Sequence, residues 1–344
     1  MLLVGEPFFP DTERAEFFAP AGQVSLFVEV LNEIYDEGQE GIVRELQHEY
    51  RAIVRALHDM KVDFRLVCRD IDTLDRQFIT DLCCEVGCKL ASFAGFRSAV
   101  TLYPRDFCAI FPSTKTLLVN PRGIRLVSSF KEDWRVYESI FGEGGRILHT
   151  GCTALIGDRV ILDDNHSRRT IDADLKVFQG SGIKVGKVPL FVSTSFGCDG
   201  RIGELSFNDH LDRIGCLITD RENSLHLILD PTIHSVEWLG DGRWRPREFE
   251  ETLDLYRSVC GPLGIEVHRP KDIQVPYSLN LLQTEDRRIL MTSGDPSVLG
   301  LVEDIMGRNY VFVTETAICS YPLFRHAGIR CLVNEMPEAI MKRV

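Results

Sequence analysis

Four short polar segments, far apart in the chain, carry residues suited to chemistry on a cationic substrate. They are Pro-Arg-Asp-Phe at 104–107, Gly-Glu-Gly-Gly at 142–145, Asp-His-Leu-Asp at 209–212 and Gly-Ile-Arg-Cys-Leu at 328–332. Together they supply carboxylates, one histidine and one late cysteine. A thiol nucleophile needs a nearby proton acceptor, and carboxylates hold a planar cation by accepting its forked hydrogen bonds. This set of residues favours covalent chemistry on a guanidinium group.

The cysteine and the histidine each have a plainer structural interpretation. Cys331 follows Gly328-Ile-Arg, where a glycine-led turn can expose a thiol and the neighbouring arginine can favour the thiolate. On local sequence alone, a buried structural cysteine is the commoner outcome. An extended segment would place His210 and Asp212 on one face of a strand, where the carboxylate can fix the imidazole tautomer. An exposed polar turn would leave the histidine solvated.

Two further carboxylates stand beside strand-like or glycine-rich segments. Asp106 follows Arg105 at the start of the apolar run 107–111, and ligands are often met at the edge of a rigid scaffold. An ordinary charge pair at the start of a strand is the alternative. Glu143 lies among glycines that let the backbone approach closely, although a Gly-Gly turn with an incidental glutamate fits equally well. The chain has no Walker-type Gly-Lys-Ser/Thr segment, and its lone glycine pair does not indicate a dinucleotide site.

The order of these segments resembles the guanidino-group-modifying, or pentein, superfamily of arginine deiminases, agmatine deiminases, dimethylarginine hydrolases and amidinotransferases. The resemblance runs from about Gln47 to the C-terminus. Its motifs are Pro104-Arg105-Asp106, Glu143-Gly144-Gly145, Thr150 to Gly157 with Ser167-Arg168-Arg169-Thr170, His210-Leu211-Asp212, and Cys331 after Gly328-Ile329-Arg330. Two positions depart from the family pattern and bear on substrate choice: Arg146 replaces a frequent aspartate, and Pro104 replaces a threonine.

The resemblance implies a cysteine-dependent hydrolase of the arginine deiminase type. Cys331 is then the nucleophile that forms a covalent amidino-thioether, His210 the general acid and base, and Glu143 the residue that orients His210. Asp106 and Asp212 hold the guanidinium, and the substrate-binding set is completed by Arg105, Arg146 and Asn280. No metal or other cofactor is expected, because the guanidinium carbon is itself electrophilic. We expect a substrate that carries both a guanidinium and a carboxylate, with free arginine as first choice.

Two alternatives to the hydrolase remain open. An amidinotransferase uses the same residues and differs in the acceptor, an amine instead of water. The segment Gly328-Ile-Arg-Cys-Leu-Val-Asn resembles the hydrolases more closely. A non-catalytic propeller that only binds its ligand is the third possibility, but it is not expected to retain all five groups.

The elements that position these residues alternate between helix and short strand. Helices are predicted at 23–36, 40–60, 72–83, 246–263 and 296–306 from apolar spacing and flanking turn residues. Strands are predicted at 61–68, 89–93, 107–111, 116–119, 146–149, 159–162, 189–193, 214–218, 225–229, 288–291, 310–313 and 329–333. This alternation favours an α/β or α+β architecture. The resemblance implies a five-bladed, pseudo-symmetric α/β propeller of ββαβ-type repeats, one domain over 1–344 with a less typical segment 1–40.

Composition restricts the partners and the compartment. The chain has 344 residues, 44% of them hydrophobic, and a formal net charge of −12. Such acidity disfavours nucleic acid and anionic membranes. The resemblance implies a small guanidino compound as the partner, and a homo-oligomer is compatible with it. The absence of a long apolar run or signal-peptide pattern, with cysteines lying in apolar runs, predicts a cytoplasmic protein. Cys83, Cys84 and Cys88 lack a second cluster at ligand spacing, so no zinc site is expected there.

Overall fold

The computed structural model describes two compact units, which are treated separately below. The described residues are 2–4, 40–68, 74–92, 108–120, 134–142, 144–157, 171–189, 191–193, 207–208, 210–231, 233–240, 243–273, 275, 278–292, 295–314 and 329–335. The first unit comprises Met1–Pro104, Thr314–Ile318 and Leu332–Val344, and the second comprises Arg105–Val313 and Cys319–Cys331.

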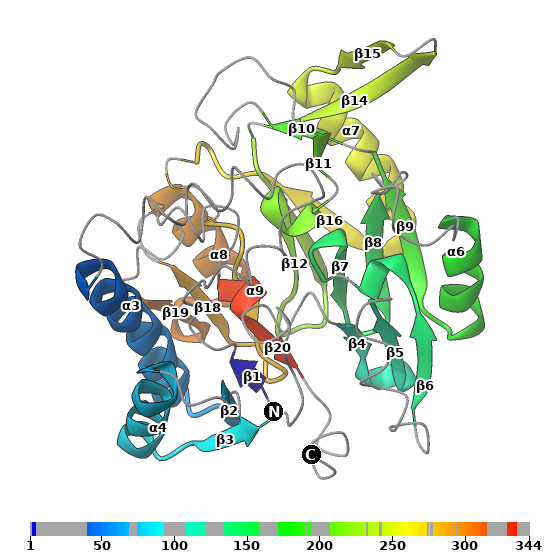
Figure 1. Cartoon of the computed structure of the whole chain (residues 1–344). Helices are drawn as coiled ribbons and strands as arrows, with labels where there is room; N and C mark the ends of the chain where they lie inside the picture. The colour runs from blue at the N-terminus through cyan, green and yellow to red at the C-terminus, as the bar shows by residue number, and fades with distance from the viewer. Residues whose placement is uncertain are drawn as a thin grey trace. The chain divides into compact units, whose positions relative to one another are not determined.

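The first unit is built on a four-stranded sheet in the order β20-β1-β2-β3 (Figure 1). Its elements are β1 (Leu2–Val4), α3 (Glu40–Asp59), β2 (Phe64–Cys68), α4 (Leu74–Val86), β3 (Lys89–Ser92) and β20 (Val333–Glu335). Strands β1, β2 and β3 are parallel, whereas β20 is antiparallel to β1. Helix α3 buries Ile53, Val54 and Leu57 on one stripe, as an amphipathic helix must.

The second unit contains the remaining sheets. Its strands are β4 (Cys108–Phe111), β5 (Thr116–Val119), β6 (Arg135–Glu138), β7 (Ile147–Thr150), β8 (Thr153–Gly157), β9 (Lys184–Val188), β10 (Phe191–Ser193), β11 (Phe207–Asn208), β12 (Gly215–Thr219), β13 (Leu225–Leu229), β14 (Ile233–Gly240), β15 (Arg243–Pro246), β16 (Ile265–His268), β17 (Leu282–Gln283), β18 (Ile289–Thr292) and β19 (Val311–Thr314). The helices are α6 (Ile171–Gly180), α7 (Phe249–Cys260), α8 (Pro296–Met306) and the short α9 (Ile329–Leu332). Short 3-10 turns are η3 (Pro112–Thr114), η4 (Ile140–Gly142), η5 (Gly144–Arg146), η6 (Leu211–Arg213), η7 (Gly261–Leu263) and η8 (Arg308–Tyr310).

One pairing scheme recurs among the three-stranded sheets of the second unit. In the sheets β4-β5-β6, β7-β8-β9 and β12-β13-β16, the first two strands are antiparallel and the third is parallel to the second. A helix precedes the third strand in the second and third of these sheets: α6 before β9 and α7 before β16. The sheet β17-β18-β19 likewise has α8 before its last strand. A further sheet has the order β11-β10-β14-β15.

Each long helix of the second unit packs in a core shared by two successive sheets. Phe178 of α6 packs with residues of β4 and β8, and Tyr256 of α7 packs with residues of β8, β12 and β13. Val302 of α8 packs with residues of β12, β13 and β18. Helix α8 begins at a capped end, because Asp295 accepts hydrogen bonds from the amides of Ser297 and Val298 at 3.2 Å each. Such a cap is worth about 1 kcal/mol.

The α/β class is confirmed, and most predicted elements are present. The helices at 40–60, 72–83, 246–263 and 296–306 match α3, α4, α7 and α8, and the strands at 116–119 and 225–229 match β5 and β13. The predicted helix 23–36 and strand 159–162 lie outside the described residues. The closed five-bladed ring and the single domain stay predictions. Among the helices that the structure describes, none has the length and apolarity to cross a membrane.

The strand predicted at 329–333 is wrong over most of its length. Residues Ile329–Leu332 form the helical turn α9, and strand β20 begins only at Val333. In this turn the amide of Arg330 donates to the carbonyl oxygen of Asn280 at 3.3 Å. An apolar, β-branched run is compatible with a strand, but here a tertiary hydrogen bond accompanies a different local geometry.

Candidate active site

A buried aspartate of helix α6 fixes the start of η4, the turn that precedes Glu143 in the sequence. Asp174, only 1% exposed, accepts hydrogen bonds through Oδ2 from the Ser139 hydroxyl at 2.8 Å and from the Ile140 amide at 3.1 Å. These bonds fix the start of η4. Glu143 lies between η4 and η5 in the chain and is itself outside the described residues. Sequence reasoning missed Asp174, because nothing in Ile-Asp-Ala-Asp-Leu distinguishes it from a solvent-exposed helical acid.

Gly145 in η5 brings the backbone directly against the His210 imidazole. A Cβ added at Gly145 would lie 2.3 Å from His210 Nδ1 and 2.9 Å from its Cε1, which no real side chain tolerates. The position therefore needs glycine because of a close approach. Arg146, partly buried, ends the same turn. The structure thus joins the Glu-Gly-Gly segment to the histidine 65 residues later in the chain.

The His210-Leu211-Asp212 segment is not an extended strand, so its histidine and aspartate do not share a strand face. His210 has extended backbone angles, φ −86° and ψ 98°, but Leu211–Arg213 form the 3-10 turn η6. The amide of Ile214 donates to the carbonyl oxygen of Leu211 at 3.1 Å. This turn carries Asp212 into the interior, where it is 1% exposed, while His210 stays half-buried.

Asp212 belongs to a chain of hydrogen bonds that links three distant segments. The Asn280 side-chain amide donates to the Asp212 carbonyl oxygen and to its carboxylate Oδ2, both at 3.2 Å. The Asn280 carbonyl oxygen in turn accepts from the Arg330 amide at 3.3 Å. Asp212, Asn280 and Arg330 are all nearly inaccessible, at 1%, 3% and 5% exposed. A carboxylate as buried as Asp212 requires such hydrogen bonds.

Arg330, the last residue of this hydrogen-bonded series, directly precedes Cys331 in the sequence. Both residues belong to α9, and the described residues give the backbone of Cys331 but not its side chain. The Arg330 guanidinium acts on Cys216 of β12, where its charge lowers the thiol pKa against a larger effect of burial. Arg330 is therefore a buried cation facing the core.

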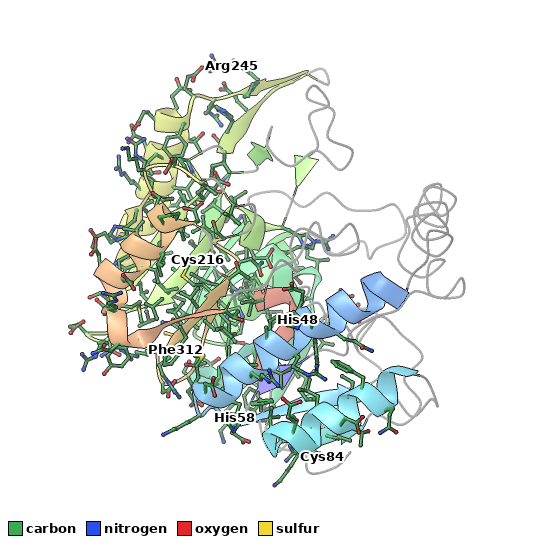
Figure 2. The ribbon with its side chains drawn as sticks, turned by 90° about the vertical axis from the view of Figure 1, so that its left-hand side faces the viewer. His48, His58, Cys84, Cys216, Arg245 and Phe312 are labelled. Atoms are coloured by element: carbon green, nitrogen blue, oxygen red, sulfur yellow. The ribbon has the colours of Figure 1, made fainter. Side chains whose placement is uncertain are left out.

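Burial rules out several described cysteines as thiolates at neutral pH. It raises the pKa of Cys216 and of Cys260 to about 12. Burial, together with the neighbouring Cys83, also raises the pKa of Cys88 to about 12. Figure 2 contrasts Cys216, which is buried in β12, with Cys84, which is exposed on α4. A reactive thiol has a lowered pKa, so Cys88, Cys216 and Cys260 are unsuited to the nucleophilic role.

The structure brings together part of the predicted site. The contacts described above connect His210, Asp212 and Asn280 with the backbone of Gly145 and Arg330. Arg105, Asp106, Glu143 and the motif 167–170 lie outside the described residues. The roles of all these residues stay predictions.

Comparison with known proteins gives a likeness of fold. No protein-family model and no curated protein matches the sequence. A solved structure provisionally described as an agmatine deiminase, a structural-genomics target, superposes with a TM-score of 0.52 and 14% identity over 98% of this chain and 92% of its own. Dimethylarginine dimethylaminohydrolase, solved as an adduct with 4-chloro-2-hydroxymethylpyridine, superposes with a TM-score of 0.46 and 13% identity over 97% of this chain and 98% of its own. At 14% identity the likeness to the first of these structures is one of fold, and the chain shares the fold of that solved structure.

Proposed function

We propose that this chain is a cysteine-dependent hydrolase of a guanidino compound. One observation carries the proposal: the hydrogen-bonded chain Asp212–Asn280–Arg330 ties the carboxylate of the His-x-Asp pair to the residue before Cys331. Asn280 lies 68 residues after Asp212 and 50 residues before Arg330, so these bonds join three segments that are far apart in the sequence. A buried structural histidine and cysteine would not need this arrangement.

In the proposed reaction, Asp212 and Asp106 accept hydrogen bonds from the substrate guanidinium. Such charge-assisted bonds are strong and directional when water is excluded. The Cys331 thiolate attacks the central carbon and forms a C–S bond. The C–N bond to the departing amine then breaks, and His210 gives that amine a proton. The product of this half-reaction is a covalent amidino-thioether.

Hydrolysis of the thioether completes the cycle. His210, now neutral, takes a proton from water as the water oxygen bonds to the amidino carbon. The C–S bond breaks, the thiolate returns, and a ureido product leaves. The contact of Gly145 with the ring of His210 supports this dual role, because the backbone fixes the imidazole position. Glu143, two residues before Gly145, is proposed to orient the ring.

The substrate proposed first is free arginine. Arg146 ends the turn whose backbone contacts His210, and we propose that its guanidinium binds a substrate carboxylate near the site. Arg105 is proposed for the same task. Agmatine lacks the carboxylate and is expected to be poorer by about 1–3 kcal/mol in transition-state stabilisation, because it cannot form the charge-assisted hydrogen bonds proposed for that group. The structural neighbour's description as an agmatine deiminase makes agmatine the decisive comparison.

The proposal is tested by a substrate panel with ammonia detection and product analysis. Arginine, agmatine and a methylated arginine are compared by kcat/KM, with Cys331→Ser as the blank. We expect arginine to yield ammonia and citrulline. In the Arg146→Gln variant, the difference in kcat/KM between arginine and agmatine should become smaller. Equal values for both substrates would remove the carboxylate role. Amidino transfer to an added amine without ammonia would indicate an amidinotransferase, and binding without turnover would indicate a binding protein.

A further inference from the structure

A second group of polar residues lies on the sheet β12-β13-β16, away from the residues of the proposed hydrolase. In the parallel register of β13 and β16, His226 pairs with Glu266, and His268 follows two residues later. Side chains alternate along a strand, so these three side chains share one face. The residues between them, Leu227 and Val267, pack in the core with α7. Three side chains of metal-binding types, two histidines and one glutamate, thus interrupt strands that are otherwise apolar.

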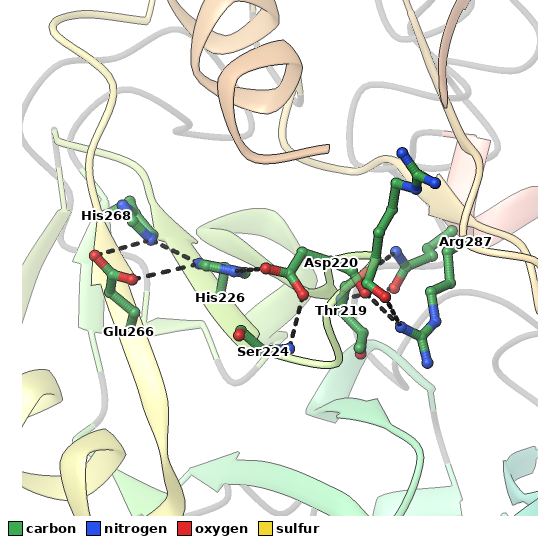
Figure 3. A network of polar contacts seen from close by, with 9 residues as sticks. Thr219, Asp220, Ser224, His226, Glu266, His268 and Arg287 are labelled. Atoms are coloured by element: carbon green, nitrogen blue, oxygen red, sulfur yellow. Dashed lines mark hydrogen bonds and ion pairs between the residues drawn. The ribbon is translucent and has the colours of Figure 1, made fainter. Parts of the chain in front are cut away.

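The three side chains converge on one point (Figure 3). His226 Nδ1 and His268 Nε2 lie 2.9 Å apart. The two carboxylate oxygens of Glu266 lie 3.8 Å from His226 Nδ1 and 3.7 Å from His268 Nε2. A tetrahedral zinc ion with Zn–N bonds of about 2.0–2.1 Å keeps its ligand atoms roughly 3.3 Å apart. Shifts of a few tenths of an ångström in two partly exposed side chains would reach that geometry.

An outer hydrogen bond sets the tautomer of His226 in the form that a metal needs. His226 Nε2 lies 3.1 Å from Asp220 Oδ2, and Asp220 Oδ1 accepts from the Ser224 amide at 2.7 Å. The Asp220 carboxylate accepts a hydrogen bond from His226 Nε2–H, which leaves the lone pair on Nδ1 facing His268 and Glu266. Carboxylate–histidine–metal arrangements have this order.

Charge and access also suit a cation. Glu266 and Asp220 bring two carboxylates to the cluster. The His226 side chain is only 9% exposed, whereas the Glu266 side chain is 69% exposed. A cation therefore has a route from solvent on the Glu266 side and a buried anchor on the other. Two imidazoles and one carboxylate suit zinc and neighbouring transition metals better than calcium or magnesium.

We propose that His226, Glu266 and His268 bind one divalent transition metal ion of the zinc type, with Asp220 fixing the His226 ring. Three protein ligands leave a position for water. The ligands lie on neighbouring strands, so the ion links β16 to the β12–β13 hairpin. The alternative arrangement is a hydrogen bond between the two imidazoles, in which His268 Nε2 donates to His226 Nδ1 and the carboxylate only screens the pair.

The test is a Zn²⁺ titration of the full chain after chelator treatment, followed by competition with a chromophoric chelator. The wild-type chain is expected to bind one equivalent of Zn²⁺ tightly. Cys331→Ser and Cys88→Ser should bind it equally well, because loss of binding in either variant would mean that a thiol is a ligand. His268→Gln is expected to lose it, weakening binding by more than the roughly 10–100-fold that loss of an outer partner costs. His58→Gln, a change of an exposed histidine on α3, serves as the matched control. Glu266→Gln, at an exposed side chain, gives a second variant that folds regardless.

Co²⁺ gives an independent readout of the ligand type. We expect visible d–d bands without the intense thiolate charge-transfer bands in the near ultraviolet, and their loss in His268→Gln. The proposal is overturned by no tight equivalent in the wild-type chain. It is equally overturned if the equivalent persists in both His268→Gln and Glu266→Gln, or disappears in Cys88→Ser. Ammonia release is measured separately, so failure of the hydrolase leaves this result unaffected.

Discussion

A buried aspartate lies near each end of strand β12. The two aspartates take their hydrogen-bond partners from different parts of the sequence. Asp220, after the strand, is bound within its own hairpin, by Ser224 and His226. Asp212, before the strand, accepts hydrogen bonds from Asn280, 68 residues away. The first aspartate needs only local chain geometry to find its partners. The second is in place only when remote segments have assembled.

This difference separates a local polar cluster from an assembled site. Short-range partners such as those of Asp220 cost little chain entropy to bring together. The Asp212 chain, by contrast, joins η6, the segment before β17, and α9. We infer that Asp212, whose hydrogen-bond partner is distant in the sequence, serves catalysis, whereas Asp220 does not. Three pairs of matched variants test that assignment, in decreasing order of expected effect.

The largest effect is expected from Asp212→Asn compared with Asp220→Asn. Removing the negative charge at Asp212 should lower kcat/KM by about 10²–10³-fold, the loss typical of one positioned electrostatic group, and should raise KM. Asp220→Asn should leave kcat/KM for arginine within about twofold and instead weaken Zn²⁺ binding. The comparison breaks if both variants lose activity equally, or if Asp212→Asn retains it.

A smaller effect is expected from Gly145→Ala compared with Gly180→Ala. A Cβ at position 145 collides with His210 Nδ1, whereas position 180 at the end of α6 has no atom within 4 Å. Displacing the imidazole by about 1 Å should cost on the order of 10²-fold in kcat, with the fold retained by circular dichroism. Gly180→Ala should keep full activity. Unchanged kcat in Gly145→Ala would show that the ring position does not matter.

The smallest effect is expected from Asn280→Ala compared with Gln283→Ala. Both side-chain amides bind an end of β12: Asn280 donates to Asp212, and Gln283 donates to the Thr219 carbonyl oxygen at 2.8 Å. Each change should lower the free energy of unfolding by about 1–3 kcal/mol in urea titrations. Only Asn280→Ala should also lower kcat, by roughly tenfold. Equal kinetic losses would mean that stability alone links these residues to activity.

The sequence predicts the elements where local pattern and tertiary packing agree. Helix α8 starts at the predicted residue because Asp295 and Pro296 form a capped beginning. Strand β13 matches because its residues are buried over almost the whole run. The segment 329–333 failed because the same apolar pattern fits a strand or a buried turn. Of the two interpretations of His210-x-Asp212, the extended one is not observed, because Leu211–Arg213 form a 3-10 turn that has no side-chain signature in the sequence.

The candidate site was predictable as a set of residues but not as a geometry. Asn280 was placed near the pocket by resemblance alone, and its bonds to Asp212 depend on a loop that periodicity does not describe. The cluster His226–Glu266–His268 was missed altogether. His226 lies 40 residues before Glu266 and 42 before His268, and only the register of β13 with β16 brings the three together. The sequence signal for this cluster was the alternation in Glu266-Val267-His268, where two polar residues flank an apolar one in a strand.

The central claim is that Cys331 is the nucleophile, and mapping a covalent label tests it most directly. The chain is treated with a chloroacetamidine-type electrophile, which resembles the guanidinium group, and the modified cysteine is identified by mass spectrometry. Exposed Cys84 on α4 serves as the internal reference for non-specific alkylation. We predict that Cys331 is labelled first, in proportion to the loss of ammonia release, and that arginine slows the labelling. Inactivation that tracks the labelling of another cysteine, with Cys331 unmodified, would contradict the account.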